Sequence, residues 1–452
     1  MDIANKATRI DLFSLKSMQM RTFHLTWFAF FLCFFGWFGI APLMAVVRED
    51  LMLTKAQIGN TIIASVAITI FARLLIGPLC DKFGPRRTYS VLLILGAIPV
   101  MSIGLANSYE SFLLCRLAIG VIGAAFVITQ YHTTVMFAPN VVGTANATTA
   151  GWGNAGGGVT QMVMPLIFSA VLMLGVSEAA GWRIAMIVPG IVLMLTGIAY
   201  YFFTRDCPEG DFKDLRAAGK LPEATKDRSA SGSFLIAAKD IRVWALFVIY
   251  GACFGVELTI HNIAAIYYLD NFELNLKTAG LLAGSFGVMA LFARTLGGWL
   301  SDRIAKNKGL TGRVRLLFVV LFMEGLMLML FSKMTILPLA VICMLAFGMF
   351  VHMSCGATFG LVPFMNRKAL GAVAGIVGAG GNAGAVAAGF LFKSEALTYQ
   401  QGLFWLGIAV TIAAFATLLV RFSPEVIAEE DAAFEKALEE RELAKQLAKA
   451  PA

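Results

Sequence analysis

Charged residues are scarce in this chain of 452 residues, and long polar segments are almost absent. Only 14% of the residues are charged, whereas 58% are hydrophobic, and the mean hydropathy is +0.77. Soluble domains contain about 25% charged residues. The composition therefore excludes an ordinary soluble protein and predicts an integral membrane protein.

The chain also lacks the ten-residue segments of alternating polar and apolar residues that are typical of outer-membrane barrels. Helices are the remaining structure that satisfies every backbone polar group in lipid, and each span needs about 20 apolar residues. We count 12 such runs, at residues 23–47, 57–79, 88–107, 111–137, 144–174, 183–203, 243–269, 278–300, 314–332, 335–358, 370–392 and 402–421. The expected fold class is an all-α membrane protein with 12 transmembrane helices.

Cysteine and histidine are too few and too dispersed to form a disulfide framework or a metal centre. The seven cysteines include no CxxC pair, and the chain has only four histidines. We also find no cluster of metal ligands, no nucleophile beside a base and no cofactor motif. The sequence therefore predicts a protein that is not an enzyme and that carries no metal or cofactor.

Lysine and arginine are unevenly distributed along the chain. Most of the 36 basic residues lie outside the spans, in segments that fall on one side of the membrane. These segments are residues 1–22, 80–87, 204–242, 301–315, 366–369 and 421–452. The positive-inside rule then predicts a multi-pass protein of the cell inner (plasma) membrane with both termini in the cytoplasm. The net charge of +8 therefore reflects topology, and no nucleic acid partner is expected.

One polar segment, residues 204–242, divides the spans into two sets of six. It contains prolines, glycines and a serine-rich stretch, which is typical of a linker. The predicted divisions are a cytoplasmic N-terminal segment, an N-terminal bundle, a linker, a C-terminal bundle and a cytoplasmic tail, at residues 1–22, 23–203, 204–242, 243–421 and 422–452. The tail alternates acids and bases, which predicts either an amphipathic helix near the membrane or a solvated terminal helix.

Two arginines occupy equivalent places in the two halves. Arg73 and Arg294 each follow Phe-Ala inside an apolar run, and an aspartate, Asp81 or Asp302, follows eight residues later. An unpaired arginine at bilayer depth costs at least about 2.5–3.5 kcal/mol, so it usually faces a cavity, a partner or a substrate. With two cations and no acid expected beside them, the repeat predicts a pathway for an anion.

Two glycine-rich segments, residues 151–161 and 378–389, share the sequence Gly-Asn-Ala-Gly. They are not phosphate loops, because no Lys-Ser or Lys-Thr follows them. Close helix packing explains the glycines. It does not explain one asparagine at the same place in each copy, Asn154 and Asn382, whose amides can donate to an oxyanion or join facing helices.

The segment after the second span, residues 77–87, resembles the G-x-L-x-D-[RK]-x-G-R-[RK] loop of major facilitator transporters, and residues 297–303 are a weaker second copy. The resemblance implies the major facilitator fold of two pseudo-symmetric six-helix bundles. Aspartates at these positions accept hydrogen bonds from helix N-termini and pair with basic residues. We therefore expect a conformational latch formed by Asp81, Arg86, Arg87 and Asp302.

Residues 116–123 resemble the R-x-x-x-G-x-x-G motif of the same superfamily. Arg116 is expected a few residues inside the membrane edge. Its guanidinium therefore either belongs to the motif or extends to the membrane surface, as long cationic side chains do. We assign it no role in substrate binding.

The glycine–asparagine segments are similar to the nitrate signature of the nitrate/nitrite porter family, and this resemblance covers essentially the whole chain. It implies that Arg73 and Arg294 clasp the anion and that Asn154 and Asn382 lie at the site. Aromatic side chains are implied to sandwich the anion, namely Phe126, Tyr250 and Phe254. For Phe126, ordinary packing against lipid is the alternative.

Nitrate is a planar monoanion, and a guanidinium presents a planar fork of donors that fits two of its oxygens. Two arginines around one monoanion leave a site with net positive charge. Repulsion between the cations would then resist closure of the empty carrier and allow closure of the loaded one.

The seventh expected span, residues 243–269, carries two titratable residues, Glu257 and His261, on one helix face. This stretch resembles the proton-coupled, assimilatory branch of the porter family. Both residues are therefore candidates for proton coupling, although Glu257 also fits a permanent bond to a neighbouring helix. Three more titratable residues within spans, His132, Glu324 and His352, fit structural roles better.

The sequence therefore predicts a secondary active transporter that imports nitrate, and also nitrite, by alternating access and proton symport for nitrate assimilation. The alternative on the same site is a nitrate/nitrite antiporter. A transporter-derived sensor and a channel-like uniporter belong to other classes, and a sensor would need a larger added domain than the tail provides. The expected partners are nitrate, nitrite, a proton and the lipid bilayer, and the expected state is a monomer.

Overall fold

The computed structural model describes residues 5–137, 142–220, 235–365 and 370–428, which are helical almost throughout. The helices are α1 Met18–Phe38, η1 Ala41–Leu43, α2 Met44–Asp50, α3 Lys55–Phe83, α4 Pro85–Ser102, η2 Ile103–Leu105, α5 Tyr109–Gly120, η3 Val121–Ala124, α6 Ala125–Met136, α7 Val142–Leu172, α8 Glu178–Ala185, α9 Ile187–Phe203, α10 Phe212–Ala217, α12 Ile241–Phe272, α13 Leu276–Val288, α14 Ala290–Ser332, α15 Leu337–Phe359, η4 Val362–Phe364, α16 Leu370–Lys393, α17 Tyr399–Ala414 and η6 Phe415–Leu419.

Twelve stretches of these helices are long and apolar enough to cross a membrane, within the described part of the chain. The expected fold class is therefore confirmed. Several spans are built from consecutive pieces: for example, α5, η3 and α6 form one, and α13 continues into the first part of α14. The rest of α14 is a further span, which follows a sharp turn at Gly309 with φ of 53°.

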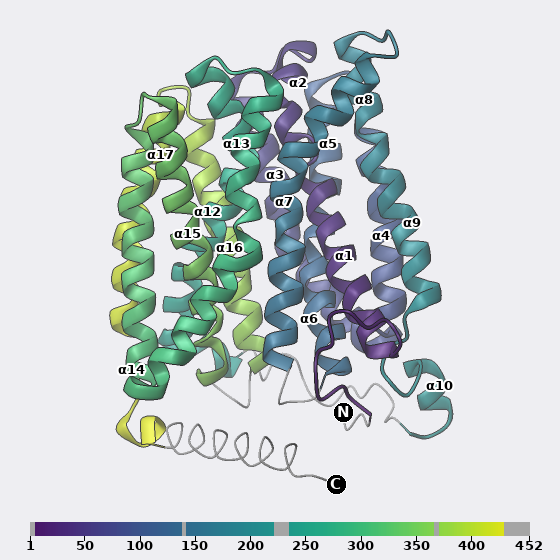
Figure 1. Cartoon of the computed structure of the whole chain (residues 1–452), viewed down its shortest axis with the longest axis vertical. Helices are drawn as coiled ribbons and strands as arrows, with labels where there is room; N and C mark the ends of the chain where they lie inside the picture. The colour runs from purple at the N-terminus through teal and green to yellow at the C-terminus, as the bar shows by residue number, and fades with distance from the viewer. Residues whose placement is uncertain (1–4, 138–141, 221–234, 366–369, 429–452) are drawn as a thin grey trace.

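The spans pack as two bundles that meet along a shared face. In the first bundle α1 packs on α7 and α4 on α9, and in the second α14 packs on α15 and α12 on α16. The two bundles meet where α7 contacts α13 and where α3 contacts α16. Helix α10 lies at one end of the molecule, here called the linker side, and α2 and α8 lie at the other, here called the far side (Figure 1).

The glycines of α7 bring the two bundles into close contact. A methyl group at Gly158 would lie 2.4 Å from the backbone nitrogen of Val288, and one at Gly280 would lie 2.2 Å from the carbonyl oxygen of Gln161. Glycines of α16 pack in the same way on α12, within the second bundle. Close packing therefore explains the glycine-rich segments, as expected for membrane helices.

The segment that follows α9 is fastened to the start of α4. Both oxygens of the Asp206 carboxylate accept backbone hydrogen bonds at 2.9 Å, one from Arg86 and one from Phe212. The Arg86 guanidinium forms an ion pair with Asp211 at 3.1 Å. Burial raises the pKa of Asp206 to about 6.

This arrangement places Arg86 of the expected latch against the beginning of the linker. Arg87 has no ion pair or hydrogen bond among the described residues, and the side chains of Asp81 and Asp302 lie outside what the structure describes. The latch therefore stays a prediction. The linker contains α10, while residues 221–234 and the tail from residue 429 lie outside the described residues.

Candidate functional site

Arg73 of α3 and Arg294 of α14 approach the same aromatic ring from opposite bundles. The Phe254 ring on α12 lies 6.0 Å from the guanidinium carbon of Arg73 and 5.6 Å from that of Arg294. Both distances lie within the range at which a cation is attracted to a ring face. The structure thus brings together the two arginines that the repeat singled out, and both guanidiniums lie near the Phe254 ring.

Arg73 donates only to backbone carbonyls. Its Nε and Nη2 atoms lie 3.3 Å from the oxygen of Gly123, and Nη1 lies 3.3 Å from that of Gly378. Gly123 belongs to η3, where the change from α to 3₁₀ geometry leaves carbonyls available. These bonds are longer than the usual 2.9–3.0 Å, and two further N–H groups of Arg73 are uncommitted. Arg73 therefore remains a cation without an acidic partner among the described residues.

Arg294 has an acidic partner, which corrects the expectation that no acid lies beside the arginines. Its Nη2 donates to Oε2 of Glu257 at 2.6 Å, and both side chains are buried. Sequence alone did not show this pair because Glu257 and Arg294 lie on different helices. As far as the structure describes the site, Arg294 is neutralised and Arg73 is not, whereas we expected two cations without acidic partners.

Asn154 of α7 reaches Arg294 from the other bundle. With its amide oriented so that the oxygen faces the guanidinium, it accepts from Nη1 at 2.6 Å and from Nη2 at 2.9 Å. This orientation is assigned from the hydrogen-bond network. The Nε of Arg294 is buried without a hydrogen-bond partner among the described residues, so it is a donor that an anion can use.

Aromatic side chains enclose the space around the arginines. Tyr250 stacks on Phe254 with ring centroids 5.1 Å apart. It also packs edge-to-face on Phe359, with ring centroids 4.9 Å apart. Phe126 lies 5.4 Å from the Arg73 guanidinium and 6.3 Å from Phe359. Phe126 thus points toward the centre of the protein, and the alternative that it packs against lipid is wrong. The sequence did not single out Phe359.

Asn382 and His261 lie near the site without contacting either arginine. Asn382 is fully buried on α16, one turn from Gly378, and neither polar atom of its amide has a partner among the described residues. The His261 ring packs on Phe38 with ring centroids 5.1 Å apart. Its Nε2 has no hydrogen-bond partner among the described residues. The two repeated asparagines therefore have different surroundings, since only Asn154 contacts an arginine.

Two titratable residues that we expected to be structural, His352 and Glu324, are buried in the second bundle, and His352 lies beside Glu257. The Nδ1 of His352, on α15, is 3.6 Å from Oε2 of Glu257. Glu324 is fully buried on α14, and neither oxygen of its carboxyl has a hydrogen-bond partner among the described residues. The sequence carries no signal that distinguishes His352, because all four histidines of the chain lie within expected spans.

Arg116 is completely buried and does not extend to the membrane surface. It donates to the carbonyl oxygen of Trp37 at 3.1 Å, to the Ser65 hydroxyl at 3.2 Å and to the Asn262 side-chain oxygen at 3.0 Å. The alternative that its guanidinium reaches the surface is therefore wrong. Since Asn262 belongs to the second bundle, Arg116 joins the two bundles through neutral acceptors.

Further polar contacts join the bundles on the far side. Arg48 forms a bidentate ion pair with Asp270, with distances of 2.9 and 3.1 Å. Lys55 donates to the carbonyl oxygens of Ser394, at 2.9 Å, and Leu397. The far ends of the bundles are thus held together in this structure.

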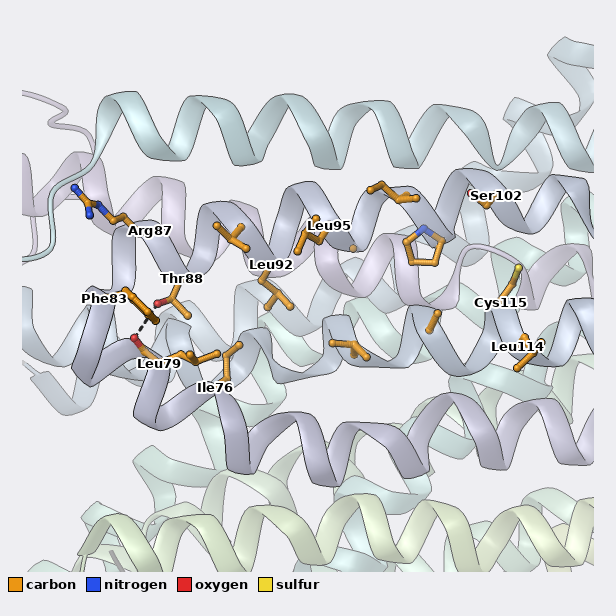
Figure 2. A pocket seen from close by; sticks show the side chains of 16 residues that line it. Ile76, Leu79, Phe83, Arg87, Thr88, Leu92, Leu95, Ser102, Leu114 and Cys115 are labelled. Carbon is orange, nitrogen blue, oxygen red and sulfur yellow. Dashed lines mark hydrogen bonds between the residues drawn. The ribbon is translucent and has the colours of Figure 1, made fainter. Parts of the chain in front are cut away.

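A groove of about 920 Å³ lies away from the arginines, along α4 between α3 and α5 (Figure 2). Its lining is apolar, and several lining side chains are exposed, including Leu95 and Leu114. Arg87 lies at its linker end (Figure 2). With no polar groups converging in it, the groove lacks the character of a site for a small anion.

Comparisons with known proteins agree with this architecture. Residues 26–389 match the Major Facilitator Superfamily. The chain is 40% identical to the high affinity nitrate transporter 2.5 of Arabidopsis thaliana, over 93% of this chain and 83% of that protein. It is 31% identical to the nitrate/nitrite transporter NrtP of Picosynechococcus, over 82% of this chain and 84% of that protein. A bacterial homologue of the human lysosomal transporter Spinster has the same fold, with a TM-score of 0.71, 16% identity and coverage of 91% of this chain and 100% of that chain.

Two helical bundles that each place a cation at the centre are the architecture of a membrane transporter. The chain belongs to the Major Facilitator Superfamily. Within that superfamily it belongs to the nitrate/nitrite porter family, because the similarity extends over most of both chains. The resemblance inferred from the sequence is confirmed. The relatives are transporters, which confirms that the protein is not an enzyme.

Proposed function

We propose that the protein imports nitrate, and also nitrite, by alternating access around the site formed by Arg73, Arg294 and Phe254. The observation that carries the proposal is the approach of two guanidiniums, one from each bundle, to one aromatic ring. The named functions of the relatives, which include high affinity nitrate transport and nitrate/nitrite transport, support the same substrate.

The charge of the site supports a monovalent anion. Glu257 neutralises Arg294, while Arg73 has no acidic partner among the described residues. The fixed charge is then +1, and one nitrate balances it. Uncommitted N–H groups on both arginines fit the coplanar oxygens of nitrate, and a guanidinium matches such a planar acceptor better than an ammonium does.

Alternating access is supported by the fact that the two proposed anion ligands, Arg73 and Arg294, belong to different bundles. An anion held by Arg73 and Arg294 links the bundles at the midplane, so each bundle changes its contacts when the anion leaves. The contacts of Arg48 and Lys55 hold the far side closed in this structure. The basic linker side is cytoplasmic by the positive-inside rule, so the far side faces outward. In this proposal the protein acts as a monomer in the inner membrane.

Proton symport is the coupling that we favour, with Glu257 and His261 as the candidates from the sequence. The favouring observation is a buried group of titratable side chains around Glu257, directly beside a proposed substrate ligand. The alternative is a nitrate/nitrite antiporter. It is favoured by the short bond between Glu257 and Arg294, since that contact resembles a permanent bond between helices.

Currents in proteoliposomes distinguish these mechanisms. For a symporter that carries more than one proton per anion, we expect inward positive current that requires nitrate and an acidic exterior, without nitrite inside. Electroneutral uptake that needs trapped nitrite would identify the antiporter. No response to nitrate under either condition would reject the proposed substrate.

A further inference from the structure

The two ring nitrogens of His352 have different surroundings. The Nε2 atom lies 3.0 Å from the carbonyl oxygen of Phe286. A carbonyl oxygen only accepts, so Nε2 carries the hydrogen. In the neutral ring Nδ1 is then a bare lone pair, and it lies 3.6 Å from Oε2 of Glu257 with no hydrogen-bond partner among the described residues. The geometry leaves Nδ1 available to accept a proton, with a carboxylate opposite it.

Three groups converge on the same oxygen of Glu257. Oε2 accepts from Nη2 of Arg294 at 2.6 Å, lies 3.6 Å from Nδ1 of His352 and lies 3.6 Å from the Cys355 sulfur. Oε1, in contrast, is buried and has no hydrogen-bond partner in the described part of the chain. A proton on Nδ1 therefore creates a second cation that competes with Arg294 for a single carboxylate.

We propose that His352 is the proton-binding residue of the transport cycle, and that its protonation loosens the bond between Glu257 and Arg294 and so frees the guanidinium for the anion. The inference rests on the proposed function and extends it. When His352 is neutral, Glu257 occupies Nη2 of Arg294. When His352 is protonated, the imidazolium shares Glu257, the site gains one positive charge, and nitrate binds more tightly.

The proton and the anion then favour each other, because coupling between two binding sites is reciprocal. Nitrate near Arg294 draws the guanidinium away from Glu257, which leaves the carboxylate free to stabilise a protonated His352. The coupling thus requires only that Oε2 of Glu257 exchange Arg294 for His352 as its partner. Both side chains already lie within 3.6 Å of this oxygen.

The other titratable or charged groups around His352 are less suited to this role. On α12, packed against α15, the Nε2 of His261 has no hydrogen-bond partner among the residues that the structure describes. On α14, Glu324 lies beside the Ser354 hydroxyl and has no cation in contact. Arg294 and Glu257 form the pair itself, Cys253 and Cys355 are buried thiols near it, and the α13 contact is the Phe286 carbonyl. Within the described ranges, only His352 combines a nitrogen that donates to a carbonyl oxygen with a second nitrogen that faces the Glu257 carboxylate without a hydrogen bond.

Nitrate binding to purified protein across pH 5–8 tests the proposal. We expect the wild-type affinity to fall as pH rises, by up to about tenfold per pH unit above the pKa of a single linked proton site. His352→Gln keeps a donor for the Phe286 carbonyl but does not titrate, so its affinity should be weaker and independent of pH. His132→Gln is the matched control, because the His132 ring forms its hydrogen bonds with Tyr200 and the Arg205 carbonyl oxygen, away from the site, and it should keep the wild-type dependence. A His352→Gln protein with the wild-type dependence would overturn the proposal.

A second measurement needs no variant. In weakly buffered solution, adding nitrate to the wild-type protein should cause uptake of up to one proton per anion bound, reported by a pH indicator dye. Nitrate binding without proton uptake at any pH in this range would reject the role of His352 while leaving the proposed substrate intact. Absence of nitrate binding to the wild type at every pH would instead reject the proposed function, and this inference with it.

Discussion

Arg73 and Arg294 are equivalent in the sequence but present different sets of free donors. Arg294 commits Nη1 and Nη2 to Asn154 and Glu257 and leaves Nε free, whereas Arg73 makes only long bonds to carbonyls. Arg73 is thus the more adaptable ligand and carries the unbalanced charge. Arg294 is a ligand whose position is already fixed by its partners.

At each arginine, substitution by lysine should weaken nitrate binding by about 10- to 100-fold. Lysine keeps the charge but loses the planar fork, and one hydrogen bond to a charged group contributes roughly 1.5–3 kcal/mol. Equilibrium binding to purified Arg73→Lys and Arg294→Lys proteins measures the loss. Arg303→Lys, at an exposed position of α14, is the control. Near-normal binding by both site variants would contradict the assignment of the anion ligands.

Glu257→Gln should destabilise the protein more than Glu324→Gln does. Removing one partner of a buried ion pair costs about 3–5 kcal/mol, because the other charge stays buried and unpaired. Here that charge is Arg294, whereas Glu324 has no cationic partner to leave behind. Thermal unfolding followed by tryptophan fluorescence compares the variants, and nitrate should restore part of the loss in Glu257→Gln. Equal losses in the two variants would show that the pair contributes little.

At the scale of elements, the segment between α9 and α10 is attached to the start of α4 by the buried carboxylate of Asp206 and by the ion pair between Arg86 and Asp211. A side chain at Gly84 would overlap Asp206, and the φ of 86° at Gly84 is itself in the region that favours glycine. Residues 84–87, Gly-Pro-Arg-Arg, thus belong to the motif at residues 77–87 and also bind the Asp206 carboxylate. Gly84 admits the carboxylate, and the first turn of α4 donates to it.

The attachment of this segment should weaken as pH rises. Burial raises the pKa of Asp206 from 3.8 to about 6, so the folded segment binds the proton more tightly than the unfolded one. Its stability is therefore complete below about pH 4 and decreases as pH rises through about 6, by roughly 1–3 kcal/mol. Hydrogen exchange at the Phe212 amide, corrected for intrinsic rates, should show this loss. Asp206→Asn should show none, and a wild-type segment that is equally protected at pH 4 and pH 7 would contradict the argument.

At the scale of the whole molecule, the sequence predicted the arrangement of spans well. It predicted less well which buried polar side chains contact each other across helices. Runs of apolar residues specify spans because lipid leaves the backbone no alternative to helices, and the repeat around Arg73 and Arg294 located the centre of the site. The partner of Arg294 depends on how α12 and α14 are rotated against each other, which no local pattern encodes. The same limit applies to Arg116 and to His352, whose contacts come from other helices.

Movement of the two bundles predicts that a link across the far side stops transport. Arg48 and Asp270 lie on opposite bundles and form an ion pair, so cysteines at both positions should be joined by a short thiol cross-linker that itself contains a reducible disulfide. Nitrate uptake should then stop and recover after reduction. The matched control is Arg183→Cys with Asp50→Cys, because that ion pair lies within one bundle and links nothing that moves. Undiminished uptake by the protein cross-linked between positions 48 and 270 would mean that the far side need not open, and the anion would have to cross without the two bundles separating there.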